Sequence, residues 1–376
     1  LVGATWNWGG IIRDVHLVKN NDVRISYQYI HAEPDLKKGS ANIKLKVRVK
    51  NSSAKKRTVM LASQIEKAPQ TTDLQYTITI PANSTKEVQL ASTLPASTVK
   101  LWHFDTPNLY HLTTTVTENG QTLAMKKDRF GIRKVELTDS QLILNGEPVR
   151  LAGFNRVSDH RYWGSSEPQY LINKDVDLMK NAGANFMRIM HGTQNKKLIE
   201  RCDEKGILLF EEVNVRELTN PEFTAPDYPL AKQWLKEMID RDVNHPSIIG
   251  WSVGNELKDH YDYAKLTIDY VKNELDPYRL VTCVSNSGWR DTATPENDPN
   301  SLVDMIMHNL YPFQGKPEEV FKTLHSKWPD KPIFISEYGI KPMATTSLDG
   351  DIPEISEWNS SLQNKNPFVI GASLWT

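Results

Sequence analysis

The decapeptide Ile248-Ile249-Gly250-Trp251-Ser252-Val253-Gly254-Asn255-Glu256-Leu257 decides how the second half of this chain is interpreted. It begins as an apolar run without charge, which is typical of a buried strand in a parallel sheet. The run ends in Asn255 and Glu256. In a fold of repeated βα units, polar residues at the C-terminal ends of strands form active sites. Asn and an early acid also suit the start of a helix, so a capping role is the alternative.

The octapeptide Pro332-Ile333-Phe334-Ile335-Ser336-Glu337-Tyr338-Gly339 repeats this arrangement of an apolar run followed by an acid. The separation between Glu256 and Glu337 leaves room for several βα units between two strands of one barrel. Paired carboxylates across a pocket are the catalytic groups of most glycoside hydrolases. The two stretches together therefore favour catalysis over two unrelated helix caps.

Three motifs resemble glycoside hydrolase family 2, which includes β-galactosidases, β-glucuronidases and β-mannosidases. They are Trp251-Ser252-Val253-Gly254-Asn255-Glu256, Ile335-Ser336-Glu337-Tyr338-Gly339 and Trp6-Asn7-Trp8-Gly9-Gly10-Ile11-Ile12-Arg13-Asp14-Val15. The resemblance reaches nearly the whole chain. It implies hydrolysis with retention, in which Glu256 is the general acid/base and Glu337 the nucleophile. Such a mechanism requires carboxyl groups roughly 5–5.5 Å apart, one protonated and one ionised.

The bulk properties describe a soluble globular protein of two or three domains. The chain has 376 residues, of which 39% are hydrophobic and 24% charged. A net charge of −1 offers no argument for a nucleic-acid or membrane partner, so a carbohydrate substrate is the partner we expect. We interpret Cys202 and Cys283 as buried thiols, although the sequence does not exclude one disulfide bond between them. The sequence shows no signal peptide or membrane-spanning run. We expect a soluble protein, periplasmic or secreted rather than cytoplasmic, and leave a homo-oligomer open.

Three segments with different patterns predict the domain organisation. Residues 1–20 predict a loop and one strand at 14–18. The resemblance implies that this segment is the end of an N-terminal jelly-roll sugar-binding domain. Alternatively, Trp6 and Trp8 are simple packing residues against the part of the chain that follows. Residues 21–135 predict a β-sandwich, because apolar and basic residues alternate along 41–50 and turn residues recur. Trp102 with Pro107-Asn108-Leu109-Tyr110 resembles the immunoglobulin-like domain of the same family, so the resemblance implies an immunoglobulin-like sandwich. Further strands are expected at 74–80, 86–90, 109–118 and 122–130.

Residues 136–376 predict a catalytic (β/α)8 barrel, because short apolar strands alternate with helical patterns. The expected strands are residues 149–154, 186–190, 208–213, 248–253, 281–284, 305–307, 333–336 and 371–375. The expected helices are residues 174–182, 196–205, 230–244, 261–275, 318–327 and 352–363. The chain stops at the eighth strand, so we expect a barrel that is incomplete at its C-terminus. A doubly wound sheet is the alternative, but no Gly-rich phosphate loop follows the first strand.

The resemblance also assigns substrate-binding residues. Asn255 would bond a sugar 2-hydroxyl, and Tyr311 would bond the nucleophile. Arg188 would hold the nucleophile ionised while His191 donates to a substrate hydroxyl, although Gly192-Thr193 replace the Tyr-Pro that commonly follows this His. A structural role is the alternative for Tyr311 and His191.

Two further positions complete the predicted site. Trp375 would form a floor under the sugar, with core packing as the alternative. Asp159 and His160 stand near the place where many members of the family have His-Glu-Asp, displaced by a residue or two. Glu211, Glu212 and Asn214 end the third strand, and the sequence does not decide which of them faces the pocket.

The substrate is predicted less sharply than the reaction. A retaining exo-β-glycosidase of β-galactosidase type is our first hypothesis. A β-glucuronidase is the enzymatic alternative. The resemblance implies that such an enzyme holds the substrate carboxylate with a cationic clamp that lies beyond the eighth strand; Arg216 is a local cation, although solvent exposure explains it more simply. A barrel that binds carbohydrate without cleaving it is the alternative from another class. Some family members hold a divalent metal, but no ligand cluster in this sequence requires one, so we expect no cofactor.

Overall fold

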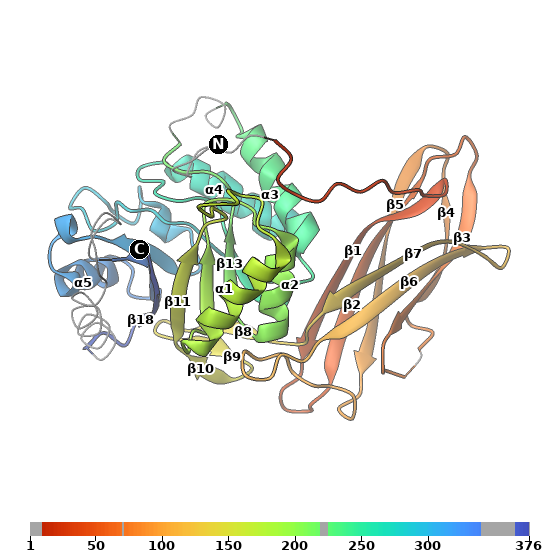
Figure 1. Ribbon diagram of the computed structural model, residues 1–376, viewed down its shortest axis with the longest axis horizontal. Coiled ribbons are helices and arrows are strands. Elements are labelled where there is room, and N and C mark those ends of the chain that lie inside the picture. Colours follow the sequence, from red (N-terminus) through yellow and green to blue (C-terminus); the bar gives the residue numbers. More distant parts are fainter. Residues whose placement is uncertain (1–9, 70, 219–224, 340–364, 376) are drawn as a thin grey trace. The chain divides into compact units, whose positions relative to one another are not determined.

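A computed structural model describes residues 10–69, 71–218, 225–339 and 365–375. Within this part, the chain forms two compact units (Figure 1). One comprises residues 13–134 together with 242–246, and the other comprises residues 135–241 and the chain from 247 onward, with residues 10–12. We describe each unit separately.

The first unit contains two antiparallel sheets. One sheet has the order β1-β2-β5, formed by β1 (Val23–Pro34), β2 (Ala41–Asn51) and β5 (Ser84–Leu94). The other has the order β4-β3-β6-β7, formed by β4 (Gln75–Ile80), β3 (Arg57–Ile65), β6 (Tyr110–Glu118) and β7 (Gln121–Phe130). The predicted sandwich is confirmed, and a single apolar cluster contains residues from both sheets.

The alternation along β2 explains why this unit could be predicted. Ile43, Leu45 and Val47 are buried, while Lys44 is exposed, as expected for a strand with one buried face. Strand β1 was not predicted, because a register shift between Ile25 and Tyr27 interrupts its period of two. Strand β3 was also missed.

The strand predicted at residues 14–18 is wrong. This segment has no strand conformation, and the apolar side chains of Val15, Leu17 and Val18 are exposed. A strand requires a hydrogen-bonded neighbour, and none of the described strands pairs with this segment. Residues Trp6 to Gly9, which begin the motif Trp6–Val15, lie outside the described residues.

The second unit is built on one parallel sheet of eight strands in the order β15-β14-β13-β12-β11-β18-β17-β16. Its strands are β11 (Leu151–Arg156), β12 (Phe186–Ile189), β13 (Leu208–Glu212), β14 (Ile248–Ser252), β15 (Leu280–Thr282), β16 (Ile306–Leu310), β17 (Ile333–Tyr338) and β18 (Val369–Leu374). A parallel bridge joins Val284, just after β15, to Met307 in β16. The sheet thus nearly closes on itself, and the predicted (β/α)8 barrel is confirmed.

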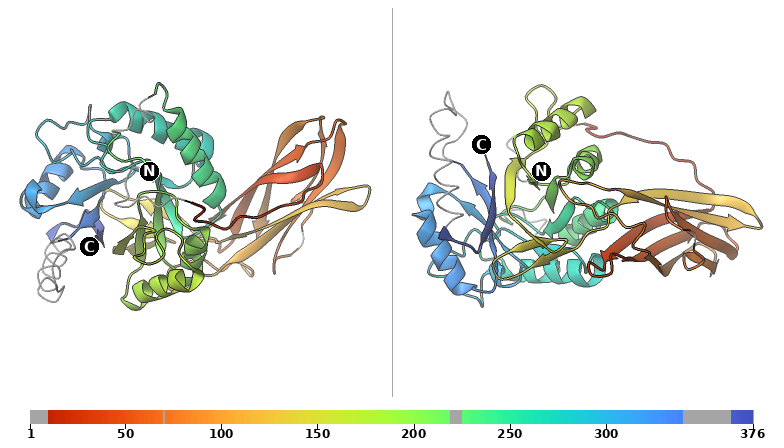
Figure 2. Two further views of the ribbon diagram at one scale, coloured as in Figure 1. Left: turned by 45° about the horizontal axis from the view of Figure 1, so that its top comes forward. Right: turned by 90° about the horizontal axis from the view of Figure 1, so that it is seen from below.

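Helices surround the parallel strands of this unit (Figure 2). They are α1 (Gln169–Asn181), α2 (Lys196–Lys205), α3 (Pro229–Asp242), α4 (Tyr261–Tyr270) with its π-helical continuation Val271–Leu275, and α5 (Pro317–Lys327). Local signals set their ends. Asn195 caps α2 by accepting a hydrogen bond from the Lys197 N–H, and Gly206 ends it with a φ of 70°. The helix predicted at 352–363 lies outside the described residues.

Before the first barrel strand, a small antiparallel sheet was not predicted. It consists of β8 (Val135–Leu137), β9 (Leu142–Leu144) and β10 (Glu147–Val149). Its strands have three residues each, too few for a periodic pattern to be recognised.

Two predictions from composition have outcomes in this part of the chain. The thiols of Cys202 and Cys283 are buried and free, as expected. None of the described helices has the length and apolarity needed to cross a membrane.

The first barrel strand depends on a residue without a side chain. A Cβ atom at Gly153 would lie 1.7 Å from the Phe186 carbonyl oxygen on β12. We expect Gly153→Ala to lower the free energy of unfolding by about 3 kcal/mol or more, because the strands must separate to admit the methyl group. Urea unfolding measures this. The neighbouring exposed substitution Ala152→Ser is the control, and an equal effect of both substitutions would contradict the expectation.

Candidate active site

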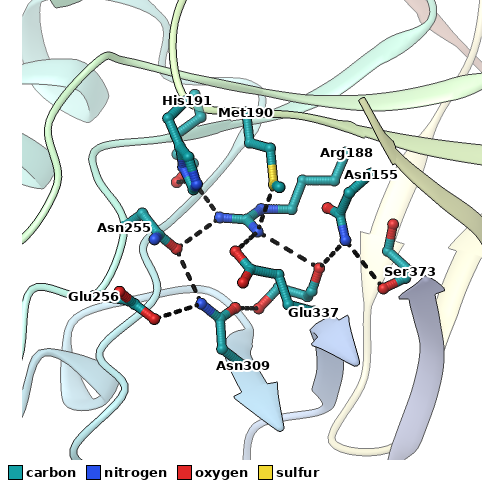
Figure 3. A network of polar contacts seen from close by, with 12 residues as sticks. Asn155, Arg188, Met190, His191, Asn255, Glu256, Asn309, Glu337 and Ser373 are labelled. Carbon is teal, nitrogen blue, oxygen red and sulfur yellow. Dashed lines mark hydrogen bonds and ion pairs between the residues drawn. The ribbon is translucent and has the colours of Figure 1, made fainter. Parts of the chain in front are cut away.

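The C-terminal ends of the barrel strands converge on the buried side chain of Arg188, which lies on β12 (Figure 3). Its Nη1 atom donates to Glu337 Oε1 at 2.7 Å, and its Nη2 atom donates to Glu212 Oε2 and Asn255 Oδ1, both at 2.8 Å. Burial acts to lower the pKa of this guanidinium, but Glu212 and Glu337 outweigh burial and raise its pKa above the ordinary value. Arg188 is therefore a fixed cation that links three strand ends.

Glu212, at the end of β13, is the residue of the third strand that faces this cation. It accepts hydrogen bonds from Arg188 and, at 2.9 Å, from the Ser252 hydroxyl, while His191 Nδ1 lies 2.8 Å from its other oxygen. Burial would raise the pKa of Glu212, but the charge of Arg188 and the contact with His191 lower it to about 2. Glu212 thus anchors both Arg188 and His191.

Glu337, on β17, is held through both carboxylate oxygens. Arg188 binds Oε1, and the Tyr311 hydroxyl donates to Oε2 at 2.5 Å. Burial and the adjacent Glu337 charge raise the pKa of Tyr311 well above its ordinary value, so Tyr311 remains a donor. The structure therefore brings together Arg188, Tyr311 and Glu337, three residues selected from sequence.

Glu256 follows β14 in the left-handed backbone region, with a φ of 53°. Its Oε1 atom accepts from Asn286 Nδ2 at 3.1 Å and from Asn309 Nδ2 at 3.2 Å. Its Oε2 atom accepts from Arg216, at 3.0 Å from Nη2 and 3.2 Å from Nε. Arg216 is therefore an ion-pair partner of Glu256 within the site, and solvent exposure alone does not explain it.

Amide side chains connect the two glutamates. Asn309 Nδ2 donates to Asn255 Oδ1 at 3.3 Å as well as to Glu256, and Asn309 Oδ1 accepts from the Ser336 hydroxyl at 2.7 Å. Asn255 Oδ1 in turn accepts from Arg188. A continuous network thus runs from Glu256 through Asn309, Asn255 and Arg188 to Glu337, as Figure 3 shows.

The remaining predicted residues lie at the margins of this network. Trp375 directly follows β18 and is half-buried, and its backbone N–H donates to the Tyr338 carbonyl at 2.9 Å. Asp159 is exposed on the loop after β11, and the Nδ1 atom of the half-buried His160 accepts from the Tyr162 N–H at 3.2 Å. The network just described contains neither Asp159 nor His160. Their roles, like that of Trp375, stay predictions.

Sequence reasoning left several members of the network unassigned. Alternation along β13 separates the two acids at its end: Glu212 faces Arg188, while Glu211 pairs with Arg241 of α3. Asn309 lies two residues before the predicted site residue Tyr311 and near the end of β16, and this position at a strand end was a usable signal. Asn286 carried no such signal, since it follows β15 within a loop. Among the described residues, no group of three or more His, Cys, Asp or Glu is arranged to hold a metal ion.

Comparison with known families agrees with this geometry. The model of the glycosyl hydrolases family 2 TIM barrel domain matches residues 135–365, and a second family 2 model matches residues 23–133. This chain belongs to glycosyl hydrolase family 2. The resemblance inferred from the three sequence motifs is thereby confirmed.

The relatives that this chain matches are named for two activities, β-galactosidase and β-glucuronidase. Over 390 residues the chain is 30% identical to a β-galactosidase of Thermoanaerobacterium thermosulfurigenes, with 98% of this chain and 50% of the relative covered. Over 270 residues it is 31% identical to the β-glucuronidase of Homo sapiens, with 65% and 40% covered. The chain therefore spans about half the length of the curated relatives it matches, or less.

Solved structures of family 2 share the fold. Bacteroides uniformis β-glucuronidase superposes with a TM-score of 0.81 at 23% identity, covering 94% of this chain and 46% of that one. A β-galacturonidase from Eisenbergiella tayi, bound to glycerol, superposes with a TM-score of 0.82 at 23% identity, covering 95% and 65%. At this identity the likeness concerns the fold alone.

A buried histidine beside the site should make stability depend on pH. Burial lowers the pKa of His308, on β16, to about 4 from its ordinary value of 6.5. Between these values the unfolded chain binds a proton that the folded chain does not. Stability contributed by neutral His308 is therefore present above pH 6.5 and is lost as the pH falls toward 4, by about 3 kcal/mol in total.

We expect His308→Gln, which keeps a donor near the position of Nε2, to remove this loss. Urea unfolding between pH 4 and 7 measures the difference between the wild-type and variant free energies of unfolding. As the pH falls from 7 to 4, the stability of the wild type relative to the variant should decrease by about 3 kcal/mol. Parallel curves for the two proteins would show that His308 does not cause the dependence.

Proposed function

We propose that this chain carries the catalytic barrel of a retaining exo-β-glycosidase of β-galactosidase type, which removes terminal β-linked sugars from oligo- or polysaccharides. The observation that supports it most is the pair of glutamates after β14 and on β17, joined by one hydrogen-bond network through Arg188. A residue pair used only as helix caps has no need of such a network. The proposal includes the domain bounds 1–20, 21–135 and 136–376.

Glu337 is the nucleophile in this proposal. Arg188 supplies the counter-charge for an ionised carboxylate, and the Tyr311 hydroxyl orients the second oxygen. A carboxylate oxygen of Glu337 attacks the anomeric carbon, which forms a glycosyl-enzyme ester as the glycosidic carbon–oxygen bond breaks. Glu337 is buried, so the attacking group is shielded from bulk water before the sugar enters.

Glu256 is the general acid/base. Its proton passes to the departing oxygen in the first step, so the leaving group departs as an alcohol. In the second step Glu256 takes a proton from a water molecule as the water oxygen attacks the anomeric carbon. That attack breaks the ester bond to Glu337 and releases the sugar, which restores both glutamates.

Asn255 is oriented to bind the sugar. Its Oδ1 atom accepts from Arg188 and Asn309, so the amide presents its nitrogen away from them. No residue of the described chain accepts a hydrogen bond from Asn255 Nδ2. This donor is therefore left for a ligand oxygen, and the sugar 2-hydroxyl is the group whose bond strengthens in the transition state. His191, Trp375, Asp159 and His160 are proposed as further substrate contacts.

Replacing the nucleophile provides the first test. We expect Glu337→Gln in the full-length protein to lower kcat on an aryl β-galactoside by about 10⁴-fold or more, because an amide does not form the glycosyl ester. Release of the aryl alcohol measures this. The exposed Glu237→Gln on α3 is the matched control, with activity expected to stay within about twofold. Full activity in Glu337→Gln would reject the assignment, and sugar binding without turnover by the wild type would favour the non-catalytic barrel.

A β-glucuronidase is the second candidate, and Arg216 is the observation that favours it. A glucuronide carries a carboxylate, for which a guanidinium is a suitable partner. The Arg216 side chain is 41% exposed, and its Nη2 atom lies 3.0 Å from Glu256 and 3.5 Å from Glu217. It is therefore a cation of the site that a charged substrate can reach.

The substrate preference can be measured with one substitution. If the substrate is a glucuronide, we expect Arg216→Gln to lower kcat/KM for an aryl β-glucuronide by about 10- to 100-fold relative to the aryl β-galactoside, because a charge-assisted hydrogen bond is lost. The exposed Arg290→Gln is the control for loss of a charge. An unchanged ratio between the two substrates would leave the galactosidase assignment in place.

The location and assembly of the protein are proposals of the same kind. We infer a periplasmic or secreted protein in which a carbohydrate is the substrate partner, and homo-oligomer formation remains part of the hypothesis. Fractionation of cells and light scattering of the purified protein test the two points.

A further inference from the structure

The two oxygens of Glu256 have different surroundings. Oε1 accepts from two amide side chains, Asn286 and Asn309, whereas Arg216 is the only donor to Oε2 in the described part of the chain. Asn309 is fully buried, but the Arg216 side chain is 41% exposed. One oxygen thus faces the interior of the barrel, and the other faces a side chain that solvent reaches.

Gln314 contacts both Asn286 and Asn309, and backbone groups determine the orientation of its side-chain amide. Its Nε2 atom donates to the Asn309 carbonyl at 3.0 Å, and its Oε1 atom accepts from the Tyr311 N–H at 3.4 Å. A carbonyl only accepts and an N–H only donates, so the amide of Gln314 has a single orientation that satisfies both. Its nitrogen is thereby directed toward Asn286.

The orientation of Asn286 follows from that of Gln314. Gln314 Nε2 donates to Asn286 Oδ1 at 3.0 Å, so the nitrogen of Asn286 is the end that faces Glu256, at 3.1 Å from Oε1. The backbone of Asn286 has a φ of 59°, a left-handed conformation that Asn adopts more readily than most residues. The backbone and the side-chain bond therefore both suit an asparagine here.

A buried histidine completes the series. His308 Nε2 lies 3.0 Å from Gln314 Oε1, which already acts as an acceptor, so the histidine must donate through Nε2. Its Nδ1 atom is buried and has no hydrogen-bond partner among the described residues, as expected for the unprotonated nitrogen of a neutral ring. His308 thus donates to Gln314, Gln314 donates to Asn286, and Asn286 donates to Glu256.

We propose that Asn286 is a positioning residue for Glu256, oriented by Gln314 and His308, and that Oε2 is the oxygen that transfers the proton in catalysis. Asn286 and Asn309 keep Oε1 in place, because the hydrogen bonds behind them prevent their amides from turning away. Arg216 is the partner that moves aside, which leaves Oε2 free to face the departing oxygen. This inference rests on the role of Glu256 as the acid/base.

The test compares leaving groups that differ in their need for a proton. Asn286→Gly removes the donor and tolerates the left-handed backbone. We expect it to lower kcat/KM for an aryl glycoside with a poorly acidic phenol by about 10-fold or more, and that for the dinitrophenyl glycoside by less than about threefold. A dinitrophenolate departs without protonation, and kcat/KM reports the first step. Equal losses on the two substrates, or none, would overturn the proposal.

Two further variants make the result specific. Asn119→Gly, in the β6–β7 turn with a φ of 50°, is the matched control for an asparagine replaced in the same backbone conformation, and it should change neither rate. Gln314→Leu leaves Asn286 in place but removes the bond that orients it. It should reproduce the dependence on the leaving group.

A crystal structure of Gln314→Leu separates this proposal from the proposed function. We expect the distance from Asn286 Nδ2 to Glu256 Oε1 to lengthen beyond hydrogen-bond range, about 3.5 Å. An unchanged contact would overturn the positioning role whether or not the protein is active. If the wild type hydrolyses no aryl glycoside, the proposed function fails, and this structure alone decides the role of Gln314 and Asn286.

Discussion

The candidate site depends on a positive charge that water does not reach. Arg188 is buried at the end of a barrel strand, and such a charge is stable only when anionic or polar groups surround it. Glu212 on β13, Glu337 on β17 and Asn255 just after β14 meet this requirement. Removing one partner of a buried pair typically costs 3–5 kcal/mol, because the remaining charge is left uncompensated. The same contacts that stabilise Arg188 therefore also hold the candidate nucleophile.

The two glutamates differ in the chemistry of their neighbours, and this difference gives the barrel its proposed division of labour. Glu337 faces a fixed cation and a tyrosine hydroxyl, whereas Glu256 faces two neutral amides and a cation that is partly exposed. A carboxyl group that exchanges a proton during a reaction needs a neighbour that can withdraw. In the proposal Arg216, whose side chain is 41% exposed, is that neighbour, whereas Arg188 is buried.

The predictions that succeeded concern residues whose roles are local to a strand. The buried apolar runs before Glu256 and Glu337 identified two barrel strands, and alternation along β2 identified the sandwich. The predictions that failed concern residues whose structure depends on contacts with distant parts of the chain. Residues 14–18 have a strand-like composition, but a strand is defined by the neighbour with which it pairs, and no described strand pairs with them. The choice between Glu211 and Glu212 likewise depended on which neighbours lie on each face of β13.

By itself, the sequence determined the class of fold, the number of barrel strands and the two acids at their ends, because buried strands in βα repeats leave a periodic record in the chain. The tertiary structure alone decided which polar residues share hydrogen bonds. Asn286 follows β15, whereas His308 and Gln314 lie on β16 and directly after it, and nothing in their local sequence connects them to Glu256. The closure of the barrel brings these segments together, and the direction of each hydrogen bond then follows from which backbone groups donate and which accept.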